Sequence, residues 1–108
     1  MSIWLYAAQR LSAMIMAPLV IGHIVLMIVA VRSGLTAGEI LGRTQGSLFW
    51  GAYYGLFVAA VSVHAAIGLR TIASETFRWR GRSLDLAMVV VGALLLALGG
   101  RAVVAVIA

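Results

Sequence analysis

The chain has 108 residues, of which 64% are hydrophobic and only 10% are charged, and its mean hydropathy is +1.12. This composition is too apolar for an ordinary soluble domain. The net charge of +5 comes from arginines at the ends of apolar runs, which fits lipid headgroups and argues against a nucleic-acid partner. The absence of cysteine excludes disulfides, thiolate metal sites and cysteine nucleophiles from this chain.

The first predicted element is a transmembrane helix over residues 11–31, an uncharged run between Arg10 and Arg32. A helix of about 20 residues can cross the hydrocarbon core, so this run is long enough to span it. The run is followed by Ser33-Gly34-Leu35-Thr36, which is typical of a helix end followed by a short connecting segment.

A second transmembrane helix is predicted over residues 47–70, and a third over residues 84–106. The second begins with aromatic residues typical of a membrane interface: Phe49, Trp50, Tyr53 and Tyr54. The connection between them, residues 77–82, is the most basic part of the chain. The sequence therefore predicts an all-α membrane protein whose single domain, residues 1–108, has three transmembrane helices.

The arginines also predict the orientation. Arg10, Arg70 and the basic connection share one side with the amino terminus, whereas Arg32 and Arg43 lie on the other. Because cytoplasmic segments are enriched in basic residues, we expect a multi-pass protein of the cell inner membrane with a cytoplasmic amino terminus.

Three ionisable residues lie deep within the predicted spans: His23, His64 and Arg101. Such residues are costly in hydrocarbon and mark functional or structural contacts. No carboxylate lies deep within a span, which counts against a proton-coupled transporter, and no serine–histidine–acid or zinc pattern is present. We therefore expect no catalytic residue here, and any enzyme chemistry would belong to a partner subunit.

His64 lies near the end of the second span and is followed by Gly68 and Arg70. Gly68 lies one turn further along the same helix face, where a flat ring can approach, and Arg70 stands at the interface to meet an anionic group. An imidazole, free space beside it and then a cation suit haem, because the haem iron takes an axial histidine and its propionates pair with a positive charge. The alternative is that His64 hydrogen-bonds a neighbouring helix and Gly68 allows close packing.

The stretch His64-x-x-x-Gly68-x-Arg70-x-x-x-x-Glu75 resembles the second-helix signature of the cytochrome b membrane anchor subunits of succinate dehydrogenase and fumarate reductase. Residues 9–13, Gln-Arg-Leu-Ser-Ala, are similar to the start of that family's first helix, and His23 falls where two-haem members carry a ligand. The chain departs from the pattern at Thr71, where the family often has a second histidine, and at Glu75, where aspartate is commoner.

The resemblance implies three transmembrane helices packed in a larger bundle with another anchor chain or a second copy. It implies that His64 and His23 ligate haem b, that Gly68 gives the ring room, and that Arg70 serves a propionate. Arg101 lies in the third span, where the chain matches the family only in hydrophobicity, and is a candidate for a propionate of the distal haem. Other interpretations stay open, because Arg101 can snorkel to the outer surface. His23 also lies on a helical stripe typical of helix contacts, formed with Ser12, Met16, Leu19 and Met27.

The two histidines are not expected to share one iron. At about 1.5 Å per residue, His23 lies roughly 20 Å beyond Arg10, and His64 lies roughly 9 Å from Arg70. Two ligand nitrogens on one metal are only about 4 Å apart. Each histidine therefore needs a ligand from a distinct second anchor subunit or a symmetry-related copy, which gives one or two haems shared with that chain.

By resemblance, the chain would anchor a flavoprotein and an iron–sulfur subunit on the cytoplasmic side and exchange electrons with quinone. The basic connection is then either a docking surface or only a topology signal. The candidate quinone residues are Trp4, Tyr6, Arg10 and Ser12, and Tyr6 stands where the family has its quinone serine. Two other functions remain open: a haem-free structural membrane anchor and a small oligomeric transporter subunit.

Overall fold

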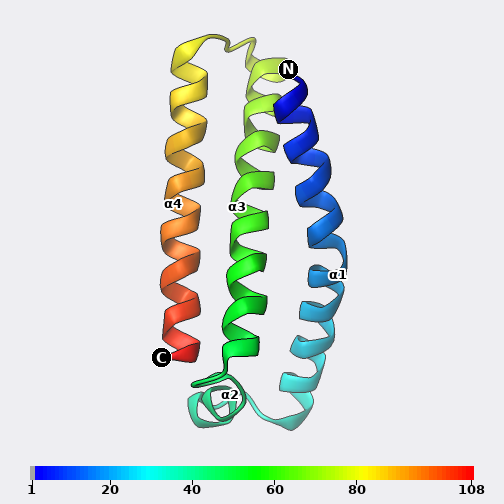
Figure 1. Ribbon diagram of the computed structural model, residues 1–108, viewed down its shortest axis with the longest axis vertical. Coiled ribbons are helices and arrows are strands. Elements are labelled where there is room, and N and C mark those ends of the chain that lie inside the picture. Colours follow the sequence, from blue (N-terminus) through cyan, green and yellow to red (C-terminus); the bar gives the residue numbers. More distant parts are fainter. Residues whose placement is uncertain (1) are drawn as a thin grey trace.

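The computed structural model describes residues 2–108, and these residues are entirely helical apart from short connections. In chain order the helices are α1 (Ile3–Ser33), α2 (Ala37–Thr44), α3 (Leu48–Phe77) and α4 (Arg82–Ile107). The three long helices run side by side along an axis of 47 Å, while α2 lies across one end (Figure 1). Each of the three is long and apolar enough to cross a membrane, which confirms the predicted fold class.

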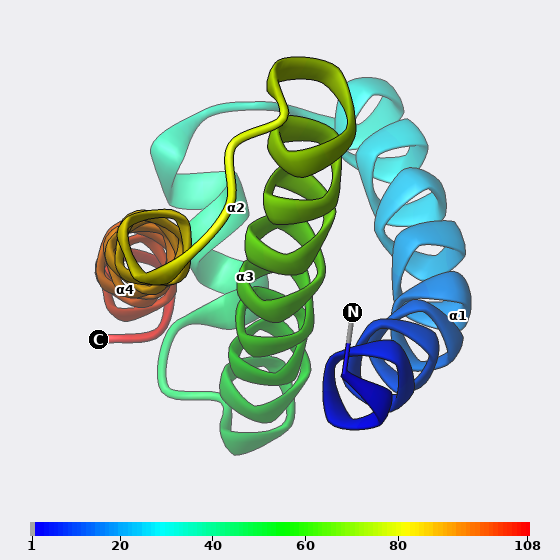
Figure 2. The same ribbon diagram turned by 90° about the horizontal axis from the view of Figure 1, so that it is seen from above.

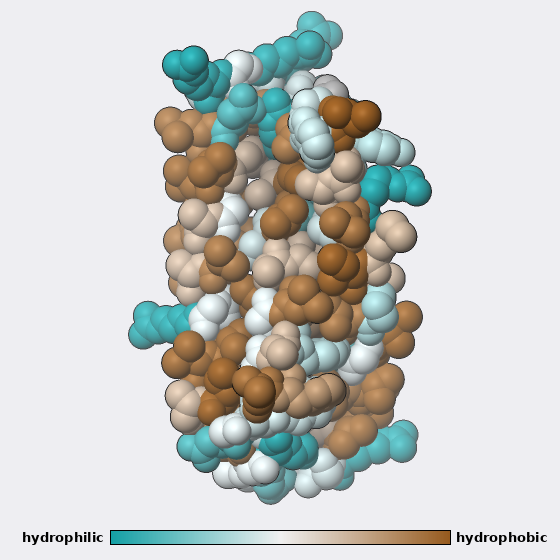
Figure 3. Space-filling model, in the orientation of Figure 1, coloured by the Kyte–Doolittle hydropathy of each residue, from teal (hydrophilic) through white to brown (hydrophobic). Residues whose placement is uncertain are grey.

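Helix α3 is the centre of the molecule. It packs against α1 on one side and α4 on the other, and from above the three form a row with α3 in the middle (Figure 2). The amino terminus and the connection between α3 and α4 lie at one end, and the carboxyl terminus and α2 at the opposite end (Figure 1). Hydrophobic side chains cover the length of the visible face, and hydrophilic ones gather at its two ends (Figure 3).

The helices are longer than the predicted spans. α1 begins at Ile3, where the Ser2 hydroxyl accepts a hydrogen bond from the Leu5 N–H at 3.3 Å, and α3 continues to Phe77. α4 runs through Arg101 without a break. Uncharged runs measure the apolar part of a span, whereas a helix continues past a charge whose side chain can reach the interface. The backbone of α3 ends at Arg78, which adopts a left-handed conformation with φ of 53°.

Helix α2 is absent from the sequence prediction, which placed only a connecting segment there. It begins at the Thr36 cap and ends against the last turn of α4. Three donors at or just after the end of α2 meet carbonyls that lack helical partners at the end of α4 and on its cap residue Ala108: Thr44 Oγ1 to Val106 O at 2.6 Å, Gly46 N to Ile107 O at 2.7 Å, and Gln45 Nε2 to Ala108 O at 3.0 Å. α2 therefore ties the start of α3 to the end of α4.

Small residues bring α3 and α4 close together. A Cβ at Gly99 would lie 2.5 Å from Cγ1 of Val58, and one at Gly92 would lie 3.3 Å from Cβ of Ala66. Close approach over small residues is the usual way helices gain packing contacts in lipid, where the hydrophobic effect does not drive them together. The α3–α4 contact therefore depends on glycines that have no room for a side chain.

Replacing Gly99 with alanine should weaken this contact, because the branched side chain of Val58 has little freedom to move. We expect the free energy of unfolding to fall by about 1–3 kcal/mol, measured by titrating the purified chain with SDS in mixed micelles. Gly100→Ala is the matched control, since its added Cβ would meet no other helix among residues 2–108 within 4 Å. Equal losses in the two variants would contradict the packing described.

Candidate functional site

His64 faces α1, where its nearest polar neighbour is Ser12. The distance between Ser12 Oγ and His64 Nδ1 is 3.4 Å, and the same hydroxyl lies 2.9 Å from the carbonyl oxygen of Gln9. Ser12 is only 5% exposed. The other ring nitrogen of His64, Nε2, has no partner within residues 2–108 and is not among their buried unpartnered atoms, so it is accessible at the surface.

Gly68 also faces α1. A Cβ at Gly68 would lie 3.5 Å from Gln9 Nε2, so the room predicted for a flat ring is partly filled by the Gln9 side chain. Within this chain Gly68 therefore contributes to helix packing, and a cofactor ring would reach it only if Gln9 moved. The carbonyl oxygen of the Gln9 side chain, Oε1, is buried without a hydrogen-bond partner among residues 2–108. Sequence analysis did not single out Gln9 as a contact of Gly68.

Arg70 meets its anionic group inside the chain. Its Nε lies 2.8 Å from Oδ1 of Asp85 in the first turn of α4, and the two side chains are 24% and 57% exposed. Sequence analysis missed this pair, although Asp85 is the only acid near the third span. The pair uses one of the five N–H donors of the guanidinium, and the remaining donors can still meet a second anion.

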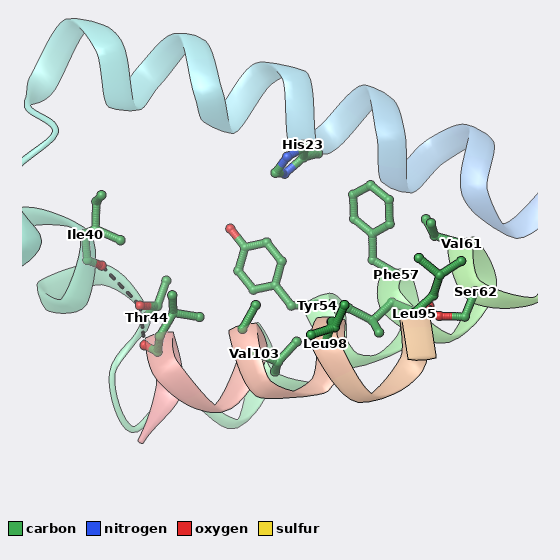
Figure 4. A pocket seen from close by; sticks show the side chains of 14 residues that line it. His23, Ile40, Thr44, Tyr54, Phe57, Val61, Ser62, Leu95, Leu98 and Val103 are labelled. Atoms are coloured by element: carbon green, nitrogen blue, oxygen red, sulfur yellow. Dashed lines mark hydrogen bonds between the residues drawn. The ribbon is translucent and has the colours of Figure 1, made fainter. Parts of the chain in front are cut away.

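His23 lines a cavity of about 550 Å³ with walls from all four helices. Its ring packs edge-on against Phe57, with centroids 5.2 Å apart, and against Tyr54 at 6.4 Å. In Figure 4 these two rings of α3 point toward His23 of α1, and the α4 side chains lie on the far side. The lining is almost entirely apolar; besides His23 and Tyr54, its polar residues are Thr44 and Ser62.

The Nδ1 atom of His23 is buried and has no hydrogen-bond partner within residues 2–108. A buried polar atom of this kind is rare and points to a missing partner, ligand or water. The cavity has the size of typical ligand sites, and an imidazole on an apolar wall is a suitable axial ligand for haem. The residues present therefore fit a haem, but they offer one imidazole where a six-coordinate b-type haem needs two.

The structure places the two histidines at different levels along the helices. His64 is level with Ser12, and His23 is level with Phe57. Ser12 and His23 are eleven residues apart, or roughly 16 Å, and Phe57 and His64 are seven apart, or roughly 10 Å. These separations exceed the roughly 4 Å between two nitrogens on one metal. One chain therefore does not bring both histidines to one iron.

The other predicted cofactor residue, Arg101, is exposed and is not among the residues that line the His23 cavity. Its neighbours Gly99 and Ala102 do line the cavity, so Arg101 lies on a different face of α4. A haem in the cavity of this chain would not meet its guanidinium directly. Arg101 is therefore not a cavity residue of this chain.

The four predicted quinone residues do not converge in this chain. Trp4 and Tyr6 are 81% and 56% exposed, and the guanidinium carbon of Arg10 lies 5.9 Å from the Tyr6 ring centroid, within cation–π range. Ser12 is buried against α3 and lies apart from them. Trp4, Tyr6 and Arg10 are therefore available to another molecule, while Ser12 is occupied within the chain.

The basic connection lies at the same end as the amino terminus (Figure 1). Arg78, Arg80 and Arg82 are all exposed, and the one ion pair among residues 2–108 is that of Arg70. The loop is shaped by Trp79, whose indole Nε1–H donates to Ser83 Oγ at 2.9 Å. This end therefore presents a cluster of free positive charge beyond the apolar part of the molecule.

Comparison with known protein families gives one match that covers most of the chain. The family model of the succinate dehydrogenase/fumarate reductase transmembrane subunit matches residues 1–100. The match extends into α4 as far as residue 100, although the sequence analysis found only hydrophobicity in that span. No curated protein and no solved structure matches the chain.

Because the Arg70–Asp85 pair is partly solvated, we expect Asp85→Asn to lower the free energy of unfolding by less than about 1 kcal/mol. The measurement is SDS titration of the purified variant beside Asp85→Glu, which keeps the charge. A loss of several kcal/mol in Asp85→Asn alone would show that the pair is a main support of the α3–α4 contact.

Proposed function

The chain belongs to the succinate dehydrogenase/fumarate reductase transmembrane subunit family, and we propose that it is a haem b-binding membrane anchor of such a complex. In this role it passes electrons between an iron–sulfur and flavoprotein unit and membrane quinone. The observation that carries the proposal is the imidazole of His64, the first residue of the second-helix signature, whose Nε2 is accessible and has no partner among residues 2–108. His23, which lines the cavity and whose buried Nδ1 has no partner among residues 2–108, supports a second haem position.

Each histidine supplies half of an axial ligand pair. Since the two lie at different levels, the second ligand at each level comes from a distinct second anchor subunit or from a second copy of this chain. A two-fold axis along the membrane normal would bring each histidine to its equivalent in the other copy. One or two haems would thereby lie between the two chains, at one or both levels.

The haem supplies one-electron transfer when it is bound. The chain's own residues would hold and shield each haem at its own level. At His23, Phe57 and Leu98 would form apolar walls that exclude water, and toward the His64 end of α3 the remaining guanidinium donors of Arg70 would meet a propionate. Asp85 then holds the arginine in place through its Nε. Arg101 would serve a propionate only of a haem that reaches beyond the cavity, toward the outer face of α4.

The exposed basic connection and the amino terminus would lie in the cytoplasm, with the chain in the cell inner membrane. The flavoprotein and iron–sulfur subunits would dock at this end, against Arg78, Arg80 and Arg82. Tyr6 and Arg10, which are exposed and in contact near the same end, would form one wall of a quinone site that a partner subunit completes. Trp4 is exposed on a different face of α1, because residues two apart on a helix do not share a face.

A haem-free structural anchor is the second candidate function. It is favoured by the contact between Ser12 and His64 and by the packing of Gln9 on Gly68, which together account for the signature residues as helix contacts. The two functions differ in whether the accessible Nε2 of His64 binds iron.

The first test is the reduced-minus-oxidised absorbance spectrum of the purified membrane complex, with haem quantified per copy of this chain. We expect a b-type signal that falls in part in His64→Ala and in part in His23→Ala, because each variant loses the ligand of one haem. Val63→Ala is the control, since Val63 is a neighbour on α3 that is 44% exposed. A wild-type complex without haem would reject the electron-transfer role and leave the structural anchor.

The orientation can be tested directly because the chain has no cysteine. Single cysteines in place of Gly81, in the basic connection, and Gly38, on α2, should react differently with a membrane-impermeant maleimide. In intact cells with a permeabilised outer membrane, we expect labelling at position 38 and protection at position 81. Labelling at position 81 alone would place the basic connection outside and contradict cytoplasmic docking.

A further inference from the structure

The hydroxyl of Ser12 lies between two polar groups, one that can only accept a hydrogen bond and one that can either donate or accept. On one side is the backbone carbonyl oxygen of Gln9 at 2.9 Å, and on the other is Nδ1 of His64 at 3.4 Å. Ser12 is 5% exposed, so water does not compete freely for these contacts. The arrangement connects two helices through residues that are 52 positions apart in the sequence.

The direction of each hydrogen bond follows from the chemistry of the three groups. A serine hydroxyl has one hydrogen to donate, whereas a backbone carbonyl can only accept. The short contact with Gln9 therefore takes the Ser12 hydrogen. Toward His64 the hydroxyl oxygen can then only accept, so the hydrogen of the neutral imidazole must be on Nδ1.

A neutral imidazole with its hydrogen on Nδ1 has its free lone pair on Nε2. Nε2 is the nitrogen of His64 that is accessible and unpartnered. Metal-bound histidines usually donate their other ring N–H to a partner, which fixes both the tautomer and the orientation of the ring. The contact with Ser12 fixes the tautomer and the orientation of the His64 ring before any metal is bound.

His23 is a natural contrast within the same chain. Its Nδ1 has no partner among residues 2–108, so no group there selects its tautomer. Its ring is oriented by aromatic packing against Phe57 and Tyr54. Any effect of Ser12 on ring chemistry should therefore be confined to His64.

We propose that Ser12 is a positioning residue that holds His64 in the Nδ1–H tautomer and presents Nε2 as the ligand nitrogen. The ligand role rests on the proposed haem function, but the tautomer does not. The same two contacts commit the Ser12 hydroxyl hydrogen to Gln9, so Ser12 has none left for a quinone.

The tautomer can be measured without haem. The full chain, labelled with ¹⁵N in its histidine rings and reconstituted haem-free in lipid nanodiscs, contains only His23 and His64, and His23→Asn assigns the two sets of signals. We expect the hydrogen of neutral His64 on Nδ1 in the wild type. Ser12→Ala removes the acceptor and should shift most of His64 to the Nε2–H form, while Ser12→Thr keeps a hydroxyl and should retain Nδ1–H.

Unchanged helical content by circular dichroism would show that the variants remain folded. A wild-type His64 with its hydrogen on Nε2 would overturn the inference, and so would a tautomer that Ser12→Ala does not alter. The His23 signals should be the same in all three chains, because Ser12 does not contact that ring.

The haem-loaded complex provides the second readout. Ser12→Ala should weaken haem binding at the His64-dependent signal about 10–100-fold and shift its reduction potential, leave the His23-dependent signal unchanged, and be rescued by Ser12→Thr. If the wild type binds no haem, the proposed function fails, while the tautomer result still stands. If haem binds equally well in Ser12→Ala, the inference fails and the proposed function remains.

Discussion

In hydrocarbon, a polar side chain finds its hydrogen-bond partner within the protein or pays a high free-energy cost, and this constraint fixes the position of α1 on α3. Two contacts set the register. The Tyr53 hydroxyl donates to the carbonyl oxygen of Leu19 at 2.6 Å, and the Ser12 hydroxyl meets His64 about two turns nearer the amino terminus of α1. Gly22 is required beside the first, since a Cβ there would lie 2.7 Å from the Tyr53 oxygen. Sliding α1 by one residue would break both contacts together.

The α3–α4 contact is built differently, and the difference matters for the site. Glycines at 92 and 99 let these helices approach closely, and Thr44 at the end of α2 together with the two residues after it holds the end of α4 through three hydrogen bonds. The close α3–α4 contact and the polar α1–α3 contact leave a cavity between α1 and α4, on one side of α3, into which His23 projects. The separation of the two histidines is thus a consequence of register, because each is fixed by a different set of neighbours.

The sequence predicted the elements that depend on lipid and missed those that depend on neighbours. Hydropathy and arginine positions were enough for three spans and their connections, since the bilayer acts on each span alone. Helix α2 was not predicted because it is short and its contacts are with α4. One of them, the hydrogen bond from Thr44 to Val106, joins residues 62 positions apart. The Arg70–Asp85 pair and the contact of Gln9 with Gly68 likewise exist only once helices are packed together. The motif around His64 could be recognised because its spacing lies within one helix. Ser12 could be recognised only by its position in the similar stretch at residues 9–13, because its contact with His64 forms only when α1 packs on α3.

Buried polar atoms without partners point to a partner for this chain, whereas exposed apolar side chains do not require one. Most large apolar side chains among residues 2–108 are exposed, but lipid tails cover leucine and valine as well as protein does. Lipid tails cannot hydrogen-bond the Nδ1 of His23 or the Oε1 of Gln9, the two buried polar side-chain atoms left unpartnered there. Both belong to α1 and stand at different levels of its length. A bound cofactor, a water or a polar group of a neighbouring chain would remove this cost, and a haem ligated from two chains would bring both a cofactor and a neighbouring chain to His23.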